Sequence, residues 1–179
     1  MPAQPINDYV VSGVKKFLDA LNSSGGTPIE RLSPRDARQV LIDAQNSATV
    51  DLSGVDQAER IIDFDGKDLK LHIVKPAGVK PGGAAAGLPV FMFFHGGGWV
   101  LGDFPTHQRL VRDLVVASGA AAVFPDYTPS PEAQYPTAIE QAYAATSGSV
   151  STAAKSGSTE TGWRLSATAS AGTWRPWSA

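Results

Sequence analysis

One histidine and three glycines follow directly after a run of large apolar residues, and this stretch is the part of the chain best suited to chemistry. It reads VFMFF at 90–94, then His95, Gly96, Gly97 and Gly98. Glycine adopts positive φ angles without steric cost, so consecutive glycines can direct successive backbone N–H groups to one point. Such donors stabilise the oxyanion of an acyl-transfer reaction, typically by about 3 kcal/mol each. For an isolated triplet of glycines, a plain turn after a strand is the alternative.

A phosphate-binding loop is a second alternative for the glycines, and the neighbouring residues exclude it. That loop needs GxxxxGK[ST], or GxGxxG at the start of a helix. Here Trp99, Val100 and Leu101 follow the glycines directly. The aromatic residues near the loop have an ordinary interpretation as well: Phe91, Phe93 and Phe94 belong to the core, whereas Trp99 and Phe104 either line an acyl pocket or simply pack.

The elements that position the loop predict an α/β fold. Helical periodicity extends from Ile6 to Leu21, and a second helix begins with Ser33 as N-cap and continues to about Asn46. Residues 58–64 and 69–75 alternate as strands and are joined at Asp65-Gly66, a favoured hairpin turn. Further elements are expected in chain order: a strand at 90–94, a helix at 106–118, a strand at 120–124 and a helix at 136–146. An antiparallel hairpin leading into a strand–helix–strand–helix series indicates an α/β sheet with right-handed crossovers.

Two motifs together resemble a known family. The first is HGGGWVLGDFPTH from His95, and the second is PDYTPSPEAQYPTA at 125–138. They resemble the oxyanion loop and the D-Y-R-L-A-P-E-x-x-(F/Y)-P-A loop of the hormone-sensitive-lipase-like α/β-hydrolases. The second motif matches at Asp126, Tyr127, Pro131, Glu132, Tyr135 and Pro136, with Thr128 where arginine is usual. The resemblance extends from about residue 5 to residue 146.

The resemblance implies a role for each residue of the loop. The N–H groups of Gly97 and Gly98 would be two donors of an oxyanion hole. His95 and Gly96 would support the loop, His95 by hydrogen bonding rather than as a base. Asp126 would help hold the same loop from the neighbouring strand. Residues 1–50 would be lid helices, residues 51–146 part of an α/β-hydrolase core, and the fold the N-terminal portion of an α/β-hydrolase with an incomplete sheet.

The catalytic groups of such an enzyme are missing from the sequence. A hydrolase of this fold uses a serine within G-x-S-x-G, followed in the chain by an acid and a histidine. No glycine here has serine two positions on and glycine four positions on. The three histidines, His72, His95 and His107, all precede the place of the nucleophile. The alternation of the strand puts His72 on a solvated face, and His107 is expected at the surface or as a capping residue. We therefore predict an inactive N-terminal fragment of a carboxylic-ester hydrolase, without any of the triad.

The composition changes abruptly after Thr146. Of the 33 residues at 147–179, 23 are Ser, Thr, Gly or Ala, which predicts an aberrant, disordered tail. Read in another frame after Thr146, the codons permit a helix end, a strand LAIV and a GNSVGG elbow, with the serine codon across Thr168 and Ala169. A frameshifted or truncated gene product is therefore expected, and a natural short variant is the alternative.

The remaining expectations concern partners and location. A formal net charge of -2 argues against a nucleic-acid partner. No apolar stretch approaches the roughly 20 residues of a membrane span, the first residues do not resemble a signal peptide, and a cytoplasmic chain is expected. The absence of cysteine excludes thiolate metal sites, and neither a metal nor another cofactor is implied.

Two expectations describe how the chain would behave on its own. The substrate of the parent enzyme would be a small acyl ester, and the alternative function is a non-catalytic ligand-binding or interaction module on the same scaffold. The family's strand order, 1-2-4-3-5, puts the strand at 90–94 next to a fifth strand, which we expect to be absent. An open apolar edge would then cause self-association.

Overall fold

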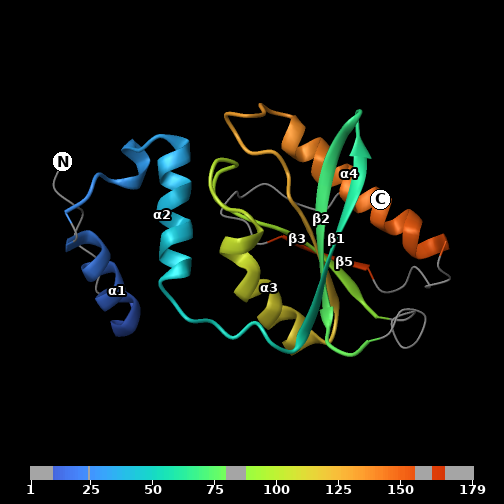
Figure 1. Ribbon diagram of the computed structural model, residues 1–179, viewed down its shortest axis with the longest axis horizontal. Coiled ribbons are helices and arrows are strands. Elements are labelled where there is room, and N and C mark those ends of the chain that lie inside the picture. Colours follow the sequence, from blue (N-terminus) through green and yellow to red (C-terminus); the bar gives the residue numbers. More distant parts are fainter. Residues whose placement is uncertain (1–9, 24, 80–87, 156–162, 168–179) are drawn as a thin grey trace. The chain divides into compact units, whose positions relative to one another are not determined.

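The computed structural model describes residues 10–23, 25–79, 88–155 and 163–167 (Figure 1). The chain forms two compact units, Met1–Ser33 and Pro34–Ala179. The first contains helix α1 (Ser12–Ser23) and the short 3-10 helix η1 (Ile29–Arg31). The second begins with α2 (Pro34–Asn46), which packs on α3 (Phe104–Ser118). Helix α2 thus belongs to the unit that contains the sheet, whereas the sequence analysis grouped it with the N-terminal residues.

The second unit contains a five-stranded mixed sheet in the order β1-β2-β4-β3-β5. Its strands are β1 (Val55–Phe64), β2 (Lys67–Pro76), β3 (Val90–Phe94), β4 (Ala121–Pro125) and β5 (Trp163–Ala167). Strands β1, β2 and β4 pair antiparallel, and β3 pairs parallel with both β4 and β5. The α/β class and this strand order agree with the sequence-based prediction.

The hairpin turn between β1 and β2 confirms the prediction made from Asp65-Gly66. Both residues have positive φ angles, 52° and 72°, and the register closes with Phe64 opposite Lys67. A two-residue turn of this kind matches the right-handed twist of its strands. The turn therefore fixes the register of the two strands, and with it the face of the sheet to which each side chain of β2 points.

Helices cover both faces of the sheet, so β3 is apolar on both sides (Figure 1). Phe91 and Phe93 pack in a cluster with Val111 and Val115 of α3. Met92 and Phe94 belong to the other cluster, which includes residues of α4 (Thr137–Lys155). Because successive side chains of a strand point to opposite faces, one five-residue strand contributes to both cores. The expected core role of the three phenylalanines is confirmed.

Strand β5 corrects two expectations about the end of the chain. Residues 163–167 pair with β3 along its whole length, from Val90 opposite Trp163 to Phe94 opposite Ala167. Helix α4 also continues to Lys155, beyond the expected end at 146. The prediction that β3 is an open edge is therefore wrong, and so is the prediction that the residues after 146 lack regular structure, at least at 147–155 and 163–167. The rest of the tail lies outside the described residues.

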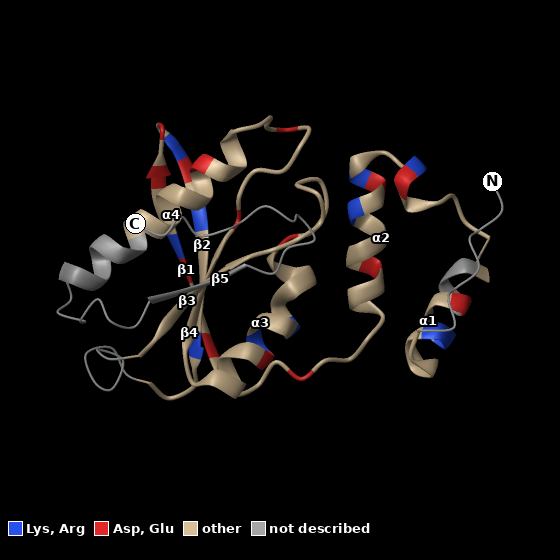
Figure 2. Ribbon diagram, turned by 180° about the vertical axis from the view of Figure 1, so that it is seen from behind, with Lys and Arg blue, Asp and Glu red and all other residues tan. Residues whose placement is uncertain are grey.

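Charges of both signs are spread over α2, β1 and β2, whereas β3 carries none (Figure 2). Among the residues that the structure describes, no helix has the length and apolar character needed to cross a membrane.

Candidate active site

The glycine loop begins where β3 ends, and its backbone conformation requires glycine. Gly97 and Gly98 have φ angles of 116° and 64°, and Trp99 follows with φ 59°. A methyl group on Gly97 would collide with the carbonyl group of Leu101. The carbonyl oxygen of Gly97 accepts hydrogen bonds from the N–H groups of Val100 (3.2 Å) and Leu101 (3.0 Å). These bonds close a tight turn that reverses the chain directly after β3.

The space in front of Gly98 is open. A Cβ atom built on this residue meets no heavy atom within 4 Å. Gly98 also lines a cavity of about 490 Å³, so a small molecule in the cavity would reach the backbone of the loop. The structure thus brings Gly98 to the wall of the cavity.

His95 packs against two aromatic rings and forms hydrogen bonds at the start of the glycine loop. Its imidazole lies 4.3 Å from the ring of Tyr127 and 5.4 Å from that of Phe124, nearly parallel to both. The hydroxyl group of Tyr127 donates a 2.8 Å hydrogen bond to the carbonyl oxygen of His95. His95 Nδ1 lies 2.8 Å from the carbonyl oxygen of Gly96. Because a carbonyl group only accepts, Nδ1 carries the proton and donates to it.

Burial determines the protonation of both partners. It lowers the pKa of His95, against the opposing effect of the hydrogen bond to Gly96, and favours the neutral ring. Burial also raises the pKa of Tyr127, so its hydroxyl group stays protonated and remains a donor. His95 is therefore a neutral residue engaged in holding the backbone, in an environment that disfavours the protonated form of a general base.

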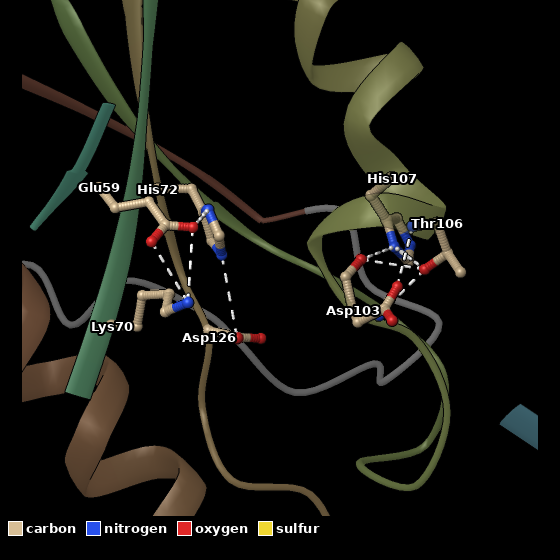
Figure 3. A network of polar contacts seen from close by, with 7 residues as sticks. All are labelled: Glu59, Lys70, His72, Asp103, Thr106, His107 and Asp126. Carbon is tan, nitrogen blue, oxygen red and sulfur yellow. Dashed lines mark hydrogen bonds and ion pairs between the residues drawn. The ribbon is translucent and has the colours of Figure 1, made fainter. Parts of the chain in front are cut away.

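Asp126 directly follows β4 and contacts two residues of β2. Its carboxylate is 3.8 Å from Nε2 of His72, and its backbone N–H donates to the carbonyl oxygen of Lys70 at 2.9 Å (Figure 3). The next residue, Tyr127, contacts His95, the residue that precedes the three glycines. Tyr127 was part of the quoted motif, but its role was not recognised from the sequence.

His72 is buried, which corrects the expectation of a solvated face. Its ring stacks on Phe104 with centroids 4.0 Å apart, and 9% of the residue is exposed. Glu59 lies 3.5 Å from Nδ1. Burial lowers the pKa of His72, although Asp126 and Glu59 act in the opposite direction. The prediction from strand alternation was wrong because α3 covers this face of β2.

His107 lies in the first turn of α3 and contacts the residues that cap this helix (Figure 3). The side chain of Asp103 accepts from the N–H of Thr106, and the hydroxyl group of Thr106 lies 2.9 Å from the N–H of Asp103, which forms a capping box. This cap explains why α3 begins at Phe104 rather than near Thr106. His107 Nδ1 lies 3.0 Å from the carbonyl oxygen of Asp103, and its ring is 5.2 Å from that of His95. The expected association of His107 with the cap agrees with this position, although the ring is half-buried.

The cavity beside Gly98 lies between two segments. On one side are Gly98, Trp99 and Val100, and on the other are residues of the loop and helix that follow β4. The second set comprises Ser130, Ala133, Gln134, Tyr135, Pro136, Ala138 and Ile139. Trp99 therefore lines this cavity. Phe104 does not, because it packs in the core on α3.

The two sides of the cavity are joined by hydrogen bonds that the sequence analysis missed. The N–H of Ser130 donates to the carbonyl oxygen of Trp99 at 2.7 Å. Arg38 of α2 donates to the carbonyl oxygens of Val100 and Ser130 and to the carboxylate of Glu132. Glu132 was visible in the second motif, but nothing in the sequence near residue 38 indicates where its side chain points.

Among the described residues, no three His, Asp or Glu side chains are grouped so that they could hold a metal ion. The side chains of Arg38, His95 and Tyr127, which lie near the loop, form hydrogen bonds to backbone carbonyl oxygens.

Comparison with known proteins agrees with this geometry. A family model described as alpha/beta hydrolase fold matches residues 91–172. An alpha/beta hydrolase of Acanthamoeba polyphaga mimivirus is 31% identical over 134 residues, covering 73% of this chain and 35% of the relative. Esterase LipI of Mycobacterium tuberculosis is 50% identical over 58 residues, or 32% of this chain and 18% of the relative.

A solved structure extends the comparison over nearly the whole chain. The thermostable esterase from Pseudomonas putida ECU1011 superposes with a TM-score of 0.79 at 54% identity, covering 92% of this chain and 49% of that one. The chain thus spans about half the length of this relative, and a smaller share of the curated ones. The strand order, the family model and this solved structure together place the chain in the class of α/β-hydrolase folds. Within that class, the chain belongs to the hormone-sensitive-lipase-like family, as its two motifs indicated.

Proposed function

We propose that this chain carries the N-terminal half of a serine carboxylic-ester hydrolase and supplies the oxyanion hole through the N–H groups of Gly97 and Gly98. The observation that carries the proposal is the position of the glycine loop, which lies at the end of β3 beside the cavity that Gly98 lines. Strand β5 runs parallel to β3 and ends opposite Phe94. A polypeptide that leaves β5 therefore starts next to the loop, where a nucleophile would have to stand.

The substrate would be a small acyl ester. In the proposed reaction, a serine oxygen attacks the ester carbonyl carbon, and the carbonyl oxygen gains negative charge. The two loop N–H groups donate to that oxygen, while the apolar wall formed by Trp99, Ala138 and Ile139 would take the acyl chain. His95 contributes by holding the loop, and the serine, the acid and the catalytic histidine come from outside residues 1–146.

By itself the chain is expected to be inactive, because its sequence contains no G-x-S-x-G and no histidine after residue 107. Without the serine no acyl-enzyme forms, and without the histidine nothing accepts the serine proton. Purified chain should hydrolyse p-nitrophenyl acetate and butyrate no faster than its Gly97→Pro variant. Turnover well above that variant would contradict this part of the proposal.

A chimera tests the oxyanion hole directly. Residues 1–146 of this chain would be joined to the corresponding C-terminal half of the Pseudomonas putida esterase, chosen for its 54% identity. The chimera should hydrolyse p-nitrophenyl butyrate. Gly97→Ala keeps the backbone N–H, but its methyl group collides with the carbonyl group of Leu101 and should displace the turn. A donor that is moved out of place should lower kcat by about 100-fold, as the loss of one oxyanion donor does. A folded chimera whose turnover is unaffected by Gly97→Ala would disprove the role of the loop.

Sequencing the gene tests the origin of the tail. If residues 147–179 come from a shifted frame, another frame downstream of codon 146 should encode a glycine-flanked serine, followed by an acid and a histidine. A gene without such a frame would favour a natural short variant.

The second candidate is a non-catalytic module that binds small acyl compounds in the same cavity. The observation that favours it is the largely apolar cavity of about 490 Å³, which is lined by residues on both sides, 98–100 and 130–139. A thermal-shift titration with methyl butyrate should then raise the melting temperature, and Ile139→Arg, which fills the cavity with a charged side chain, should abolish the shift. A folded chain without any shift could not be such a module.

A further inference from the structure

A single guanidinium group connects three parts of the second unit around the glycine loop. Arg38 Nε donates to the carbonyl oxygen of Val100 at 2.7 Å, and Nη2 donates to that of Ser130 at 2.7 Å. Nη1 and Nη2 also donate to the two carboxylate oxygens of Glu132 at 2.6 and 2.8 Å. These partners are 62 to 94 positions away in the sequence. Arg38 therefore connects α2 to two loops that are themselves distant in the chain.

The two carbonyl groups belong to opposite sides of the cavity. Val100 follows the glycine loop, and Ser130 lies in the loop after β4; both line the cavity next to Gly98. The bond from the Ser130 N–H to the Trp99 carbonyl joins the same two segments directly. Any change in the separation of the two sides must therefore break a bond to Arg38, the bond between Ser130 and Trp99, or both.

The chemistry of the group requires arginine. Arg38 donates four hydrogen bonds from one planar group to three different residues. A guanidinium group can do this because it carries five N–H donors in a fixed planar arrangement. The ammonium group of lysine is a compact point charge and cannot span the carboxylate and both carbonyl oxygens with the same geometry.

Glu132 holds the guanidinium group in one orientation. In that orientation, its other N–H groups donate to the carbonyl oxygens of Val100 and Ser130. The side chain of Glu132 is 52% exposed, whereas that of Arg38 is 22% exposed. Exposed ion pairs contribute little to stability, so the carboxylate matters chiefly because it fixes the plane of the guanidinium. The hydrogen bond from Arg38 lowers the pKa of Glu132 to about 2, and the pair therefore stays ionised across the physiological range.

From these contacts we propose that Arg38 is a positioning residue that holds the glycine loop and the loop after β4 at a fixed separation, and so sets the width of the cavity beside Gly98. The inference rests on the proposed function for its biological meaning, since that cavity is the proposed acyl site. Its test requires no substrate and no turnover, so it can fail or succeed independently of the proposed ester hydrolysis.

The test is amide hydrogen exchange on the whole chain, followed by mass spectrometry of peptides. Arg38→Met keeps an unbranched apolar side chain and removes every donor. It should accelerate exchange by about tenfold in peptides that cover 97–102 and 128–133, because the two hydrogen bonds from the Arg38 side chain to backbone carbonyl oxygens are lost. Peptides from β2 and β4, which report opening of the sheet, should exchange at the wild-type rate. Arg35→Met, an exposed arginine on the same helix, is the matched control and should leave all peptides unchanged.

Two further variants separate positioning from simple stabilisation. Arg38→Lys keeps the charge but should resemble Arg38→Met in the two loop peptides, while Glu132→Gln, which keeps an acceptor, should give a smaller acceleration. Uniform acceleration of all peptides in Arg38→Met would show a general loss of stability and overturn the proposal. Wild-type exchange in Arg38→Lys would also overturn it, because charge alone would then suffice. If Arg38→Met does not fold, the comparison of Arg38→Lys with Glu132→Gln decides by the same criteria.

Discussion

The hydroxyl group of Tyr127 donates a 2.8 Å hydrogen bond to the backbone carbonyl of His95, while the two rings stack with centroids 4.3 Å apart. One side chain therefore fixes both the backbone and the ring of the residue that precedes the three glycines. The glycine loop receives its conformation from β4 as well as from β3. Contacts at the ends of both strands thus hold the residue from which the glycine loop starts.

Replacing Tyr127 with phenylalanine should keep the stack and remove the hydrogen bond. The buried carbonyl oxygen of His95 would lose a donor, and we expect the free energy of unfolding to fall by about 1–3 kcal/mol. Urea denaturation would measure the change. Tyr143→Phe is the matched control, because Tyr143 is 74% exposed and should unfold as the wild type does. Equal effects of the two substitutions would show that the hydrogen bond does not stabilise the fold.

Gly97→Ala and Gly98→Ala should differ, although both residues have positive φ angles. At Gly98 the methyl group has open space, so only the backbone strain of about 1–2 kcal/mol is expected. At Gly97 the methyl group also collides with the carbonyl group of Leu101, and the loss should be larger by at least about 1 kcal/mol, because the turn itself must shift. Chemical denaturation of the two variants side by side would check the order, and a greater loss at Gly98 would contradict the described turn.

The sequence predicted those parts of the fold that local chemistry determines. The Asp65-Gly66 turn was identified from two residues, and the bounds of β3 were predicted correctly because its apolar run ends abruptly at His95. Strand β5 was missed because WRLSA is short and has neither a clear period nor turn signals of its own. Its strand conformation depends on pairing with β3, which comes from a distant part of the chain.

In the candidate site, too, only the features that local sequence determines could be predicted. The glycine loop and the residue that stacks on His95 both lie in motifs that can be read from the sequence. Arg38 cannot be found in this way, because its four hydrogen bonds depend on where α2 packs in the second unit. The burial of His72 likewise depends on Phe104 of α3, which covers a strand face that alternation alone marks as polar.

Stability should fall as the pH decreases below about 6.5. Burial lowers the pKa values of His72 and His95 in the folded chain, so the unfolded chain binds protons more readily than the folded chain does. Their effect on the free energy of unfolding is most favourable above the unfolded pKa of about 6.5 and is lost as the pH falls toward the lower folded values.

Denaturant midpoints between pH 5 and pH 8 would measure this dependence. His72→Gln should reduce the slope below pH 6.5, because it removes one of the two rings. A slope that is unchanged in His72→Gln would assign the pH dependence to other groups.

Phe93→Lys should unfold the chain or strongly destabilise it. If β3 were the open edge that the sequence analysis expected, this substitution would improve solubility. In the structure, however, Phe93 is 0% exposed and packs 5.6 Å from Phe124. Burying an unpaired ammonium group there, with loss of the aromatic packing, should cost more than about 3 kcal/mol. A cooperative melt near the wild-type temperature would show that β3 is accessible to solvent after all. Ile61→Lys is the matched control, since Ile61 is an apolar strand residue that is 58% exposed.

The last prediction concerns β5, because its pairing with β3 decides whether the sheet has an apolar open edge. A chain that ends after Lys155 lacks β5 and leaves unpaired the side of β3 that faces β5, along Val90–Phe94. Such an edge, without charge or proline, pairs readily with other chains. The shortened chain should therefore elute as oligomers in size-exclusion chromatography at about micromolar concentrations, while the full chain elutes as a smaller species.

Leu165→Pro tests the same pairing of β5 with β3 in a chain of full length. Proline removes a backbone donor opposite Met92 and should weaken the pairing, so this variant should behave like the shortened chain. If both variants elute as the wild type does, β5 does not protect β3, and something else must cover the edge.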